Sequence, residues 1–472
     1  MTDLYLGIDL GTSGCRIIAI DNNGTIHGQS SRALPAPLRN GDAVEQDPQL
    51  WWTAVQEALH DLLGFLSGHA AVVPGILNPS LRSPTTLAEP FANALPCAAV
   101  APGILPPATL AHPCAARIRA IAVDGTSATL LLTDDAGRPL GSALMYHDAR
   151  STLHAAQIKR IAPPESGAHG ATSALAKLLY LHQQPDIGQA RHAVHQADWI
   201  MGQFSGHFGI SDENNALKLG YDAVKREWPA WLDNLGINKK LLPEVLPPGT
   251  PIGTITAQIQ REFGLSPDTR VVTGTTDSTA AFLATGAHSA GEAVTSLGST
   301  LVIKIISPKP IFAPTYGIYS HRLGDLWLAG GASNSGGAVL LQYFTQDQLT
   351  AMTPQLQPAQ ATGLDYYPLL VPGERFPVCD ATFAPRLTPR PADDLQFFQG
   401  MLEGIAGIEQ QGYQRLAELG APYPTAVYTA GSGARNKAWQ EIRQRMLHVP
   451  IHNAKQQDAA YGAALLAKGF FK

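Results

Sequence analysis

An acidic residue followed by a glycine-rich turn, near the start of the chain, is the first feature that could do chemistry. Asp9 lies at the end of an apolar run, residues 4–10, and a second apolar run follows at 15–20. Between them, residues 11–14 read Gly-Thr-Ser-Gly; the glycines allow several N–H groups to point toward one place, and the hydroxyls add donors for phosphate oxygens. Asp9 would attract a hydrated Mg²⁺ ion beside them. The alternative is an ordinary tight hairpin whose turn Asp9 caps.

The second half of the chain carries a similar set of residues. Asp277 follows a strand-like run and precedes an alanine-rich helix predicted over 279–285, so it could instead be the N-cap of that helix. Two strand-like runs within 293–306 surround Leu-Gly-Ser-Thr at 297–300, a second candidate phosphate hairpin. The turn at residues 11–14 is not a phosphate loop of the Walker type, because no lysine and no helix follow its glycines. We therefore predict an α/β fold with the two-domain actin-like ATPase (ribonuclease H-like) architecture and a cleft between the domains.

Composition indicates an ordinary globular enzyme. A length of 472 residues predicts two domains or three, and 45% apolar residues is typical of a protein with a sizeable core. The net charge of −5, with lysine and arginine scattered along the chain, gives no reason to expect nucleic acid or an anionic membrane as a partner. The four cysteines form no metal-ligand spacing and no apolar run is long enough to span a bilayer, so we expect a cytoplasmic protein with reduced thiols.

Proline density divides the chain. Residues 74–113 contain nine prolines and almost no charge, which predicts a long loop or lid-like insertion at about 68–116. A second proline-rich stretch at 243–251 predicts the domain boundary, with an N-terminal domain at 1–244 and a C-terminal domain at 252–472. Strand-like runs within 117–133 repeat the strand–turn–strand pattern of residues 4–24.

Four helices have clear sequence signals. Asp47 and Pro48 mark the start of an amphipathic helix that continues to about Phe65. Further helices are predicted at 393–419, 437–447 and 459–468. Three glycines inside the first of these are costly in a helix and predict close approach of another backbone; they are Gly400, Gly404 and Gly407.

Taken together and in this order, the motifs resemble those of the FGGY carbohydrate kinases. The resemblance runs from residue 4 to about 468 and lapses only in the proline-rich insertion. The motifs that carry it are 7–13 (GIDLGTS), 274–278 (GTTDS), 298–300 (GST) and 430–436 (AGSGARN), with EQDP at 45–48 and YGAA at 461–464.

Within that group, residues 123–127 (VDGTS) and 330–337 (GGASNSGG) most resemble pentulose kinases of the cyanobacterial and plant type. The resemblance implies ATP-dependent phosphorylation of the terminal hydroxyl of a ketopentose, D-ribulose before D-xylulose. Glycerol kinases carry an Arg-Glu pair and an aromatic residue where this chain has Asp124, Thr126 and Ser127, which argues against glycerol. Two departures from the family pattern are Ser432, where glycine is usual, and His147 in the segment 146–150.

The resemblance also implies a role for individual residues, ATP and Mg²⁺ as cofactors, a sugar as the small-molecule partner and a homodimer as one assembly seen in the family. Asp277 would be the general base, Asp9 the carboxylate on the magnesium side, and the two hairpins the two sides of an ATP clamp. The implied catalytic residues are Asp277, Asp9 and Thr12; the substrate-binding residues are Ser127, Ser278, Asp124 and Asp148; the nucleotide-binding residues are Gly11, Thr12, Ser13, Gly298, Ser299, Thr300, Gly431, Ser432, Gly433 and Asn436; and the metal ligands are Asp9 and Asp277.

Other interpretations remain open at this point. Asp124 could satisfy the backbone of its own turn, residues 431–436 could be a plain packing turn, and Arg150 could form a surface salt bridge rather than a substrate contact. At the level of the whole chain, a non-enzymatic actin-like ATPase and a weak sugar kinase retained as a binder are the competing functions.

Overall fold

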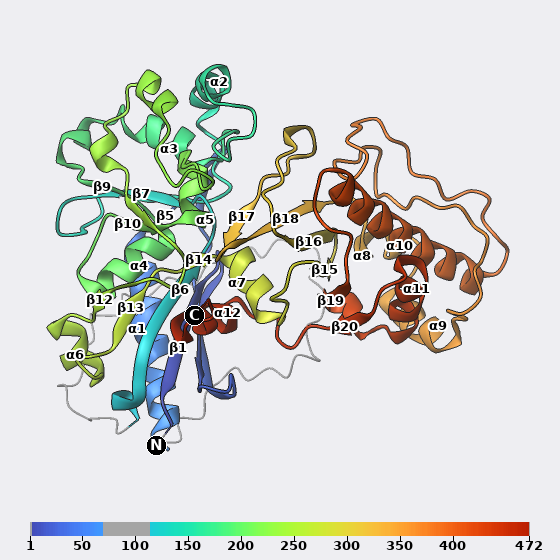
Figure 1. Ribbon diagram of the computed structural model, residues 1–472, viewed down its shortest axis with the longest axis horizontal. Helices are drawn as coiled ribbons and strands as arrows, with labels where there is room; N and C mark the ends of the chain where they lie inside the picture. Colours follow the sequence, from blue (N-terminus) through green and yellow to red (C-terminus); the bar gives the residue numbers. More distant parts are fainter. Residues whose placement is uncertain (1, 69–113, 472) are drawn as a thin grey trace, which may run out of the picture.

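The computed structural model describes residues 2–68 and 114–471, so the proline-rich insertion predicted at 74–113 lies outside the described residues. Two large sheets with their helices lie side by side (Figure 1). The first contains β12 (Pro251–Thr254), β13 (Arg270–Val272), β6 (Ile118–Gly125), β1 (Leu4–Leu10), β2 (Gly14–Ile20) and β3 (Ile26–Ala33) in that order, and β14 (Thr275–Thr276) also pairs with β6. The second contains β17 (His321–Leu323), β18 (Leu326–Ala332), β16 (Leu301–Ser307), β15 (Glu292–Leu297), β19 (Ala426–Ala430) and β20 (Ile451–Asn453).

Five strands of each sheet have the same order and directions. In each, three strands pair antiparallel (β1, β2 and β3; β15, β16 and β18), and two later strands add in parallel to the free edge of the first strand: β6 and β13 beside β1, and β19 and β20 beside β15. This duplicated arrangement is the ribonuclease H-like topology, and it confirms the predicted architecture of two similar halves. Because the first strand is central in each sheet, the turn that follows it lies at the middle of the sheet's edge.

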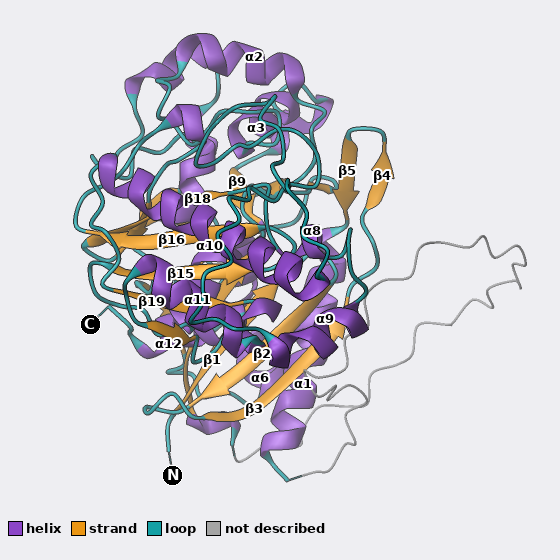
Figure 2. Cartoon of the chain, turned by 90° about the vertical axis from the view of Figure 1, so that its right-hand side faces the viewer, coloured by secondary structure: helices purple, strands orange, loops and turns teal. Residues whose placement is uncertain are grey.

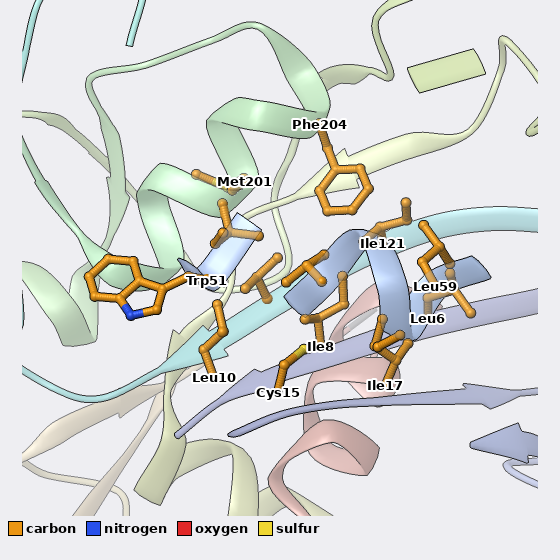
Figure 3. Close-up of a cluster of buried hydrophobic side chains, with 14 of the residues drawn as sticks. Leu6, Ile8, Leu10, Cys15, Ile17, Trp51, Leu59, Ile121, Met201 and Phe204 are labelled. Atoms are coloured by element: carbon orange, nitrogen blue, oxygen red, sulfur yellow. The ribbon is translucent and has the colours of Figure 1, made fainter. Parts of the chain in front are cut away.

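A layer of helices covers one face of the first sheet. Helix α1 (Pro48–Leu66) begins where the sequence predicted, since the Asp47 side chain accepts from the Gln49 N–H at 2.9 Å and caps it. With α4 (Gln196–Ser205) and α6 (Ala257–Phe263) it buries Trp51, Leu59 and Phe204 against the sheet (Figure 3). The other face is covered by α7 (Asp277–Ala284) and the final helix, α12 (Ala459–Lys468).

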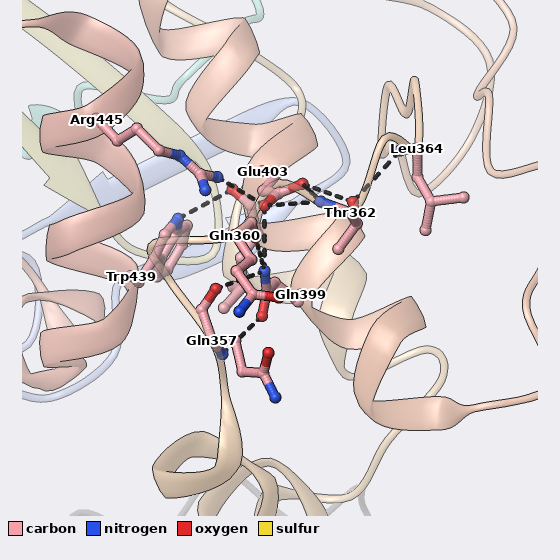
Figure 4. A network of polar contacts seen from close by, with 9 residues as sticks. Gln357, Gln360, Thr362, Leu364, Gln399, Glu403, Trp439 and Arg445 are labelled. Carbon is pink, nitrogen blue, oxygen red and sulfur yellow. Dashed lines mark hydrogen bonds and ion pairs between the residues drawn. The ribbon is translucent and has the colours of Figure 1, made fainter.

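The second sheet is covered by α10 (Asp394–Glu418) and α11 (Lys437–Leu447), which Figure 2 shows lying across its strands. The prediction of close backbone approach along α10 is confirmed at one of its three glycines. A Cβ at Gly404 would lie 2.8 Å from Tyr366 O, whereas one at Gly400 would lie 2.7 Å from the Leu364 side chain and Gly407 has only a 3.6 Å side-chain contact. Glu403 on the same helix accepts from the Thr362 N–H and hydroxyl and from Arg445 at 2.7 Å, which holds the segment around 357–364 on the helix (Figure 4).

A smaller layer of elements extends the first half beyond its sheet. A five-stranded sheet in the order β4, β5, β8, β7 and β9 and a two-stranded sheet of β10 and β11 lie here with short helices. The bounds of these elements are β4 Leu38–Asn40, β5 Ala43–Gln46, β7 Leu130–Thr133, β8 Ala143–Leu144, β9 His192–His195, β10 Ile210–Asp212, β11 Glu244–Leu246, α2 Thr152–Ile161, α3 Ala174–Leu181 and α5 Glu213–Ala216.

Two further helices, α8 (Gly337–Leu340) and α9 (Gln346–Met352), lie in the second half. Within the residues that the structure describes, no helix is both long and apolar enough to cross a membrane.

Two expectations about organisation are corrected. Residues 117–133 do not repeat the hairpin of residues 4–24, because β6 has neighbours on both edges and β7 pairs with β8 and β9 in another sheet. Residues 251–276, assigned by the sequence to the C-terminal domain, supply β12, β13 and β14 of the first sheet. The second proline-rich stretch is therefore not where the chain leaves the first sheet. Helix α12 also returns to that sheet at the end of the chain.

The packing of α12 on α7 gives a stability prediction. A Cβ on Gly462 would lie 1.8 Å from Ala280 O, a backbone atom that cannot move aside, so Gly462→Ala should lower the melting temperature by several degrees, the effect of about 1–3 kcal/mol of overpacking. Gly64→Ala is the matched control: it is also a helical glycine, but has nothing within 4 Å of its Cβ position, and should leave the melting temperature unchanged or raise it. Equal melting temperatures for the two variants would contradict the close α7–α12 contact.

Candidate active site

Three carboxylates lie together at the carboxyl ends of neighbouring strands in the first sheet. Asp9 on β1 is paired in register with Asp124 on β6, and Asp124 is paired with Thr275 on β14. Two residues after Thr275, Asp277 begins helix α7. Residues 268 positions apart in the sequence thus meet at one edge of the sheet, which is where ligands bind in open α/β folds.

Burial raises the pKa values of all three, and repulsion from neighbouring carboxylates adds to the shift at Asp9 and Asp124. Burial raises the pKa of Asp9 to about 6; a hydrogen bond with Asp124 and the charge of Arg16 oppose the shift, while Asp458 and Asp277 add to it. Burial raises the pKa of Asp124 well above its ordinary value, with further increases from Asp9 and Asp277. Burial also raises that of Asp277, against the N–H of Ser278 and the charge of Lys304. Clustered carboxylates of this kind attract a cation and are typical of functional sites.

Asp124 and Asp9 have different environments. Asp124 is fully buried, and no amide or hydroxyl of the described residues bonds to either of its carboxylate oxygens; its carboxyl group meets that of Asp9 instead. Asp9 is half-buried and lies 3.8 Å from Arg16 Nη1, which forms a 3.0 Å ion pair with Asp458 at the start of α12. Asp124 is therefore the member of the pair whose neutral form burial favours more strongly, and Asp9 is the more exposed member.

The first candidate phosphate turn is the hairpin between β1 and β2. Its backbone is closed by a bond from the Gly11 N–H to Gly14 O at 3.0 Å. The Thr12 side chain is half-buried and that of Ser13 is exposed, so hydroxyl and N–H groups are available beside Asp9. The prediction of a hairpin at this position is confirmed.

The second candidate turn and the glycine loop at 431–436 come together because β15 and β19 are parallel neighbours. Ser296 pairs with Ala430, so Gly298, Ser299 and Thr300 emerge beside Gly431, Ser432 and Gly433. The close approach of residue 431 to the end of β15 requires glycine, because Gly431 has φ +86° and a Cβ there would lie 2.5 Å from Leu297 O. Asn436 caps α11 by accepting from the Trp439 N–H at 3.0 Å, so its side chain has the packing role that the sequence left open.

The predicted substrate residues are not equivalent in the structure. Ser127 is half-buried with its hydroxyl unpartnered, and Ser278 is exposed next to Asp277. Asp148 is fully buried and accepts from the Val44 N–H at 2.6 Å and from Arg150, which also binds Glu45. Its carboxylate thus holds the segment 146–150 in place, and Arg150 forms the salt bridge that the sequence offered as one alternative; a sugar contact of Asp148 stays a prediction.

Two lysines missed by the sequence interpretation lie at the site. Lys304 on β16 donates to Ser278 O at 2.8 Å, and burial lowers its pKa to about 8 against the attraction of Asp277. Lys177 on α3 is fully buried and donates to Ala128 O at 2.8 Å and to Tyr146 O at 3.3 Å, joining the two predicted sugar segments. The available signal was a single lysine inside the apolar run 301–306.

Lys304 also lines a cavity of about 430 Å³ whose walls come from the second half of the molecule. His321 and Tyr319 line it as well, and Tyr319 is shared with a second cavity of about 630 Å³ that reaches Lys159 and Glu165 of the first half. Residues of both halves therefore line the second cavity.

The comparisons with known proteins decide the family. The model of the N-terminal domain of the FGGY family of carbohydrate kinases matches residues 4–76 and 108–284, and that of the C-terminal domain matches 293–468. The chain belongs to the FGGY family of carbohydrate kinases. It is an ATP-dependent sugar kinase, and the two halves of this FGGY kinase correspond to the two family domains.

Solved structures share the fold at low sequence identity. A crystal structure described as a xyloylose kinase from Brucella ovis has a TM-score of 0.79 at 22% identity, covering 98% of this chain and 90% of that one. A gluconate kinase from Lactobacillus acidophilus has a TM-score of 0.76 at 19% identity, with coverage of 99% and 89%. Among curated proteins, the autoinducer-2 kinase of Yersinia enterocolitica is 27% identical over 390 residues, which cover 75% of this FGGY kinase and 73% of the relative.

The environment of Asp124 predicts how stability depends on pH. The pKa of Asp124 is higher in the folded protein than in the unfolded chain. The folded protein is therefore most stable, as far as Asp124 is concerned, at low pH, where this carboxyl is neutral in both states. That contribution to the free energy of unfolding is lost as the pH rises from about 4 toward the pKa of the folded state. Asp124→Asn stays neutral throughout, so in the absence of nucleotide and magnesium its melting temperature should exceed that of the wild type increasingly between pH 5 and 8. Asp148→Asn, equally buried but deprived of its ion pair with Arg150, should melt below the wild type instead. If the melting temperatures of Asp124→Asn and Asp148→Asn, each relative to the wild type, changed in the same way with pH, a raised pKa of Asp124 in the folded protein would be contradicted.

Proposed function

We propose that this FGGY kinase transfers the γ-phosphoryl group of ATP to the terminal hydroxyl of a ketopentose, D-ribulose before D-xylulose. The observation that carries the proposal is the placement of Asp277: it starts helix α7, its charge acts on Asp9, and Lys304 of the second sheet donates to the next residue, Ser278. Residues 123–127 and 330–337 support the pentulose assignment by their resemblance to pentulose kinases.

In this reaction Asp277 accepts the proton of the sugar hydroxyl as the oxygen attacks the γ-phosphorus. The new P–O bond forms while the bond from the γ-phosphorus to the β–γ bridging oxygen breaks, and ADP leaves. Thr12 and Ser13 on one side, and Ser299 and Thr300 on the other, donate to the phosphate oxygens. Lys304, 2.8 Å from Ser278 O, places a positive charge near the transferring group and favours the ionised form of Asp277.

The residues at the site also suit a magnesium ion. Asp9 and Asp277 present hard oxygen ligands, and the buried, unpartnered oxygens of Asp124 lie behind Asp9. Mg²⁺ binds proteins through one or two carboxylates and keeps much of its water, so Asp9 and Asp277 would hold it; it would supply positive charge to the phosphate oxygens. The fully buried Asp124 would act only by orienting Asp9.

The cytoplasm is the proposed location, and it follows from the thiols. Of the three cysteines among the described residues, Cys15 and Cys114 are buried and Cys379 is exposed, and none of these three forms a disulfide. Free thiols are usual in a reducing compartment, where ATP is also abundant.

The second candidate activity is phosphorylation of autoinducer-2. Curated relatives of that name are 27–28% identical to this chain over 390 residues. The sugar panel described next therefore includes autoinducer-2.

A coupled ADP-release assay decides the acceptor. The panel contains D-ribulose, D-xylulose, glycerol, gluconate, rhamnulose and autoinducer-2, each at the same ATP and Mg²⁺ concentration. We expect kcat/KM for D-ribulose to exceed that for D-xylulose, and that for glycerol to be at least about 100-fold lower, since the site lacks the paired groups that a glycerol kinase would use. Activity confined to autoinducer-2, or to none of the ketopentoses, would refute the pentulose assignment.

Asp277→Asn tests the base. The amide keeps the size and the capping ability of the carboxylate but cannot take a proton, so kcat should fall by about 10²–10⁴-fold while ATP affinity changes by less than about threefold. Asp393→Asn is the matched control, because Asp393 is an aspartate at the start of another helix, where it accepts from the Leu395 N–H at 2.9 Å, and it is not among the residues placed at the site. It should leave kcat unchanged. Turnover by Asp277→Asn above about a tenth of the wild-type value would remove Asp277 from the role of base.

A further inference from the structure

Asn214 is buried at the junction between the two halves and bonds to both of them. It lies on helix α5, is 1% exposed, and its backbone N–H donates to Asp212 Oδ1 at 2.8 Å. Its side chain contacts the strand that leads to Asp277 and, on the other side, the edge strand of the second sheet. No residue of the reaction described above is involved in these bonds.

The contact with the first sheet is a single hydrogen bond. Asn214 Nδ2 donates to Thr275 Oγ1 at 3.0 Å. Thr275 is fully buried on β14, the strand that pairs with β6 and ends two residues before Asp277. Asn214 therefore touches the segment whose position determines where the base lies.

The contact with the second sheet is a pair of hydrogen bonds to one backbone unit. Asn214 Oδ1 accepts from the Arg322 N–H at 2.8 Å, and Nδ2 donates to Arg322 O at 3.0 Å. Arg322 is on β17, which pairs only with β18 and is the edge strand of that sheet. The amide side chain thus satisfies the free edge of β17 much as a neighbouring strand would.

Apolar packing surrounds the same point. Leu217 and Tyr221 from the first half form a buried cluster with Trp327 from the second, and the Arg322 guanidinium lies 4.1 Å from the centre of the Trp327 ring. Arg322 Nε also donates to Ala223 O at 3.2 Å. The junction is therefore a packed contact, and a bond inside it will hold its geometry.

We propose that Asn214 is a positioning residue for phosphoryl transfer: by joining Thr275 to the edge of β17, it sets the position of Asp277 relative to the second sheet, which carries the 298–300 turn. The proposal rests on the proposed role of Asp277. An amide suits this task because one group must accept from a backbone N–H while donating to a backbone carbonyl and a hydroxyl. Displacement of a reacting group by about 1 Å can cost 10²-fold in rate even when the substitution is remote.

Steady-state kinetics of Asn214→Ala and Asn215→Ala test the proposal. Asn215 is the matched control, since it is also 1% exposed on α5 but donates only within its own segment, to Asp212 Oδ2 at 2.7 Å. We expect Asn214→Ala to lower kcat by about 10–100-fold with KM for ATP and sugar changed less than about threefold, and Asn215→Ala to keep kcat within about threefold at a comparable loss of melting temperature. Equal kcat losses in both variants, or wild-type kcat in Asn214→Ala, would overturn it.

A second pair of variants isolates the bond to the base strand. Thr275→Val removes the hydroxyl at nearly constant volume, and Thr275→Ser keeps it. Thr275→Val should lower kcat in the same manner as Asn214→Ala, and Thr275→Ser should restore most of it. Full activity in Thr275→Val would contradict coupling through this bond.

Hydrogen exchange separates this proposal from the proposed function, because it needs no turnover. In Asn214→Ala, but not in Asn215→Ala, the amide of Arg322 should exchange faster, and so should amides within 275–278. If the wild-type protein phosphorylates no sugar of the panel, the proposed acceptor class fails while these exchange rates still judge the junction. Unchanged exchange at 275–278 in Asn214→Ala would show that Asn214 does not position the base segment.

Discussion

The site depends on keeping three carboxylates side by side in a largely dry environment. Burial raises the pKa values of Asp9, Asp124 and Asp277, and repulsion between carboxylates adds to the shift at Asp9 and Asp124, so the cluster would separate if the chain allowed it. It is held by the in-register pairing of β1, β6 and β14. The tendency of the buried Asp124 to hold its proton and the nearby cations Arg16 and Lys304 offset the remaining repulsion. The same excess of negative charge is what would attract a magnesium ion and orient a nucleotide.

The duplicated sheet topology explains why the nucleotide-side loops meet where they do. In each half the first strand is central, so its turn faces the cleft at mid-edge. In the second half the parallel neighbour β19 adds the 431–433 loop to that turn, and the close fit of Gly431 against Leu297 leaves no room for a side chain. Gly336 lies against the 298–300 turn as well, since a Cβ at this position would be 2.6 Å from Ser299 O. Backbone proximity, not side-chain chemistry, therefore shapes this part of the cleft.

The sequence predicted what local signals determine. The Asp47 cap, the hairpins at 11–14 and 298–300 and the bounds of α12 follow from residues within a few positions of one another. The predictions that were wrong depend on partners far along the chain. The partner of β7 is set by β8 and β9, and the sheet to which β13 belongs is set by the free edge of β6. The bonds of the Asp148 carboxylate to Arg150 and to the Val44 N–H, 104 residues away, are likewise shown by no spacing rule.

The segment 275–278 is bonded to both halves of the molecule, and this determines which groups can move in a closure of the cleft. Thr275 pairs with β6 and accepts from Asn214, while Lys304 of the second sheet donates to Ser278 O. Because residues 275–278 are bonded to both halves, they can move less than the turns at 11–14 and 298–300, each of which belongs to one sheet only. Closure of the cleft would then bring the turns at 11–14 and 298–300 toward Asp277, the proposed base, which would stay nearly in place. Asp277 would lie at the pivot, so that the phosphate is carried to the base and water is excluded as the two sides meet.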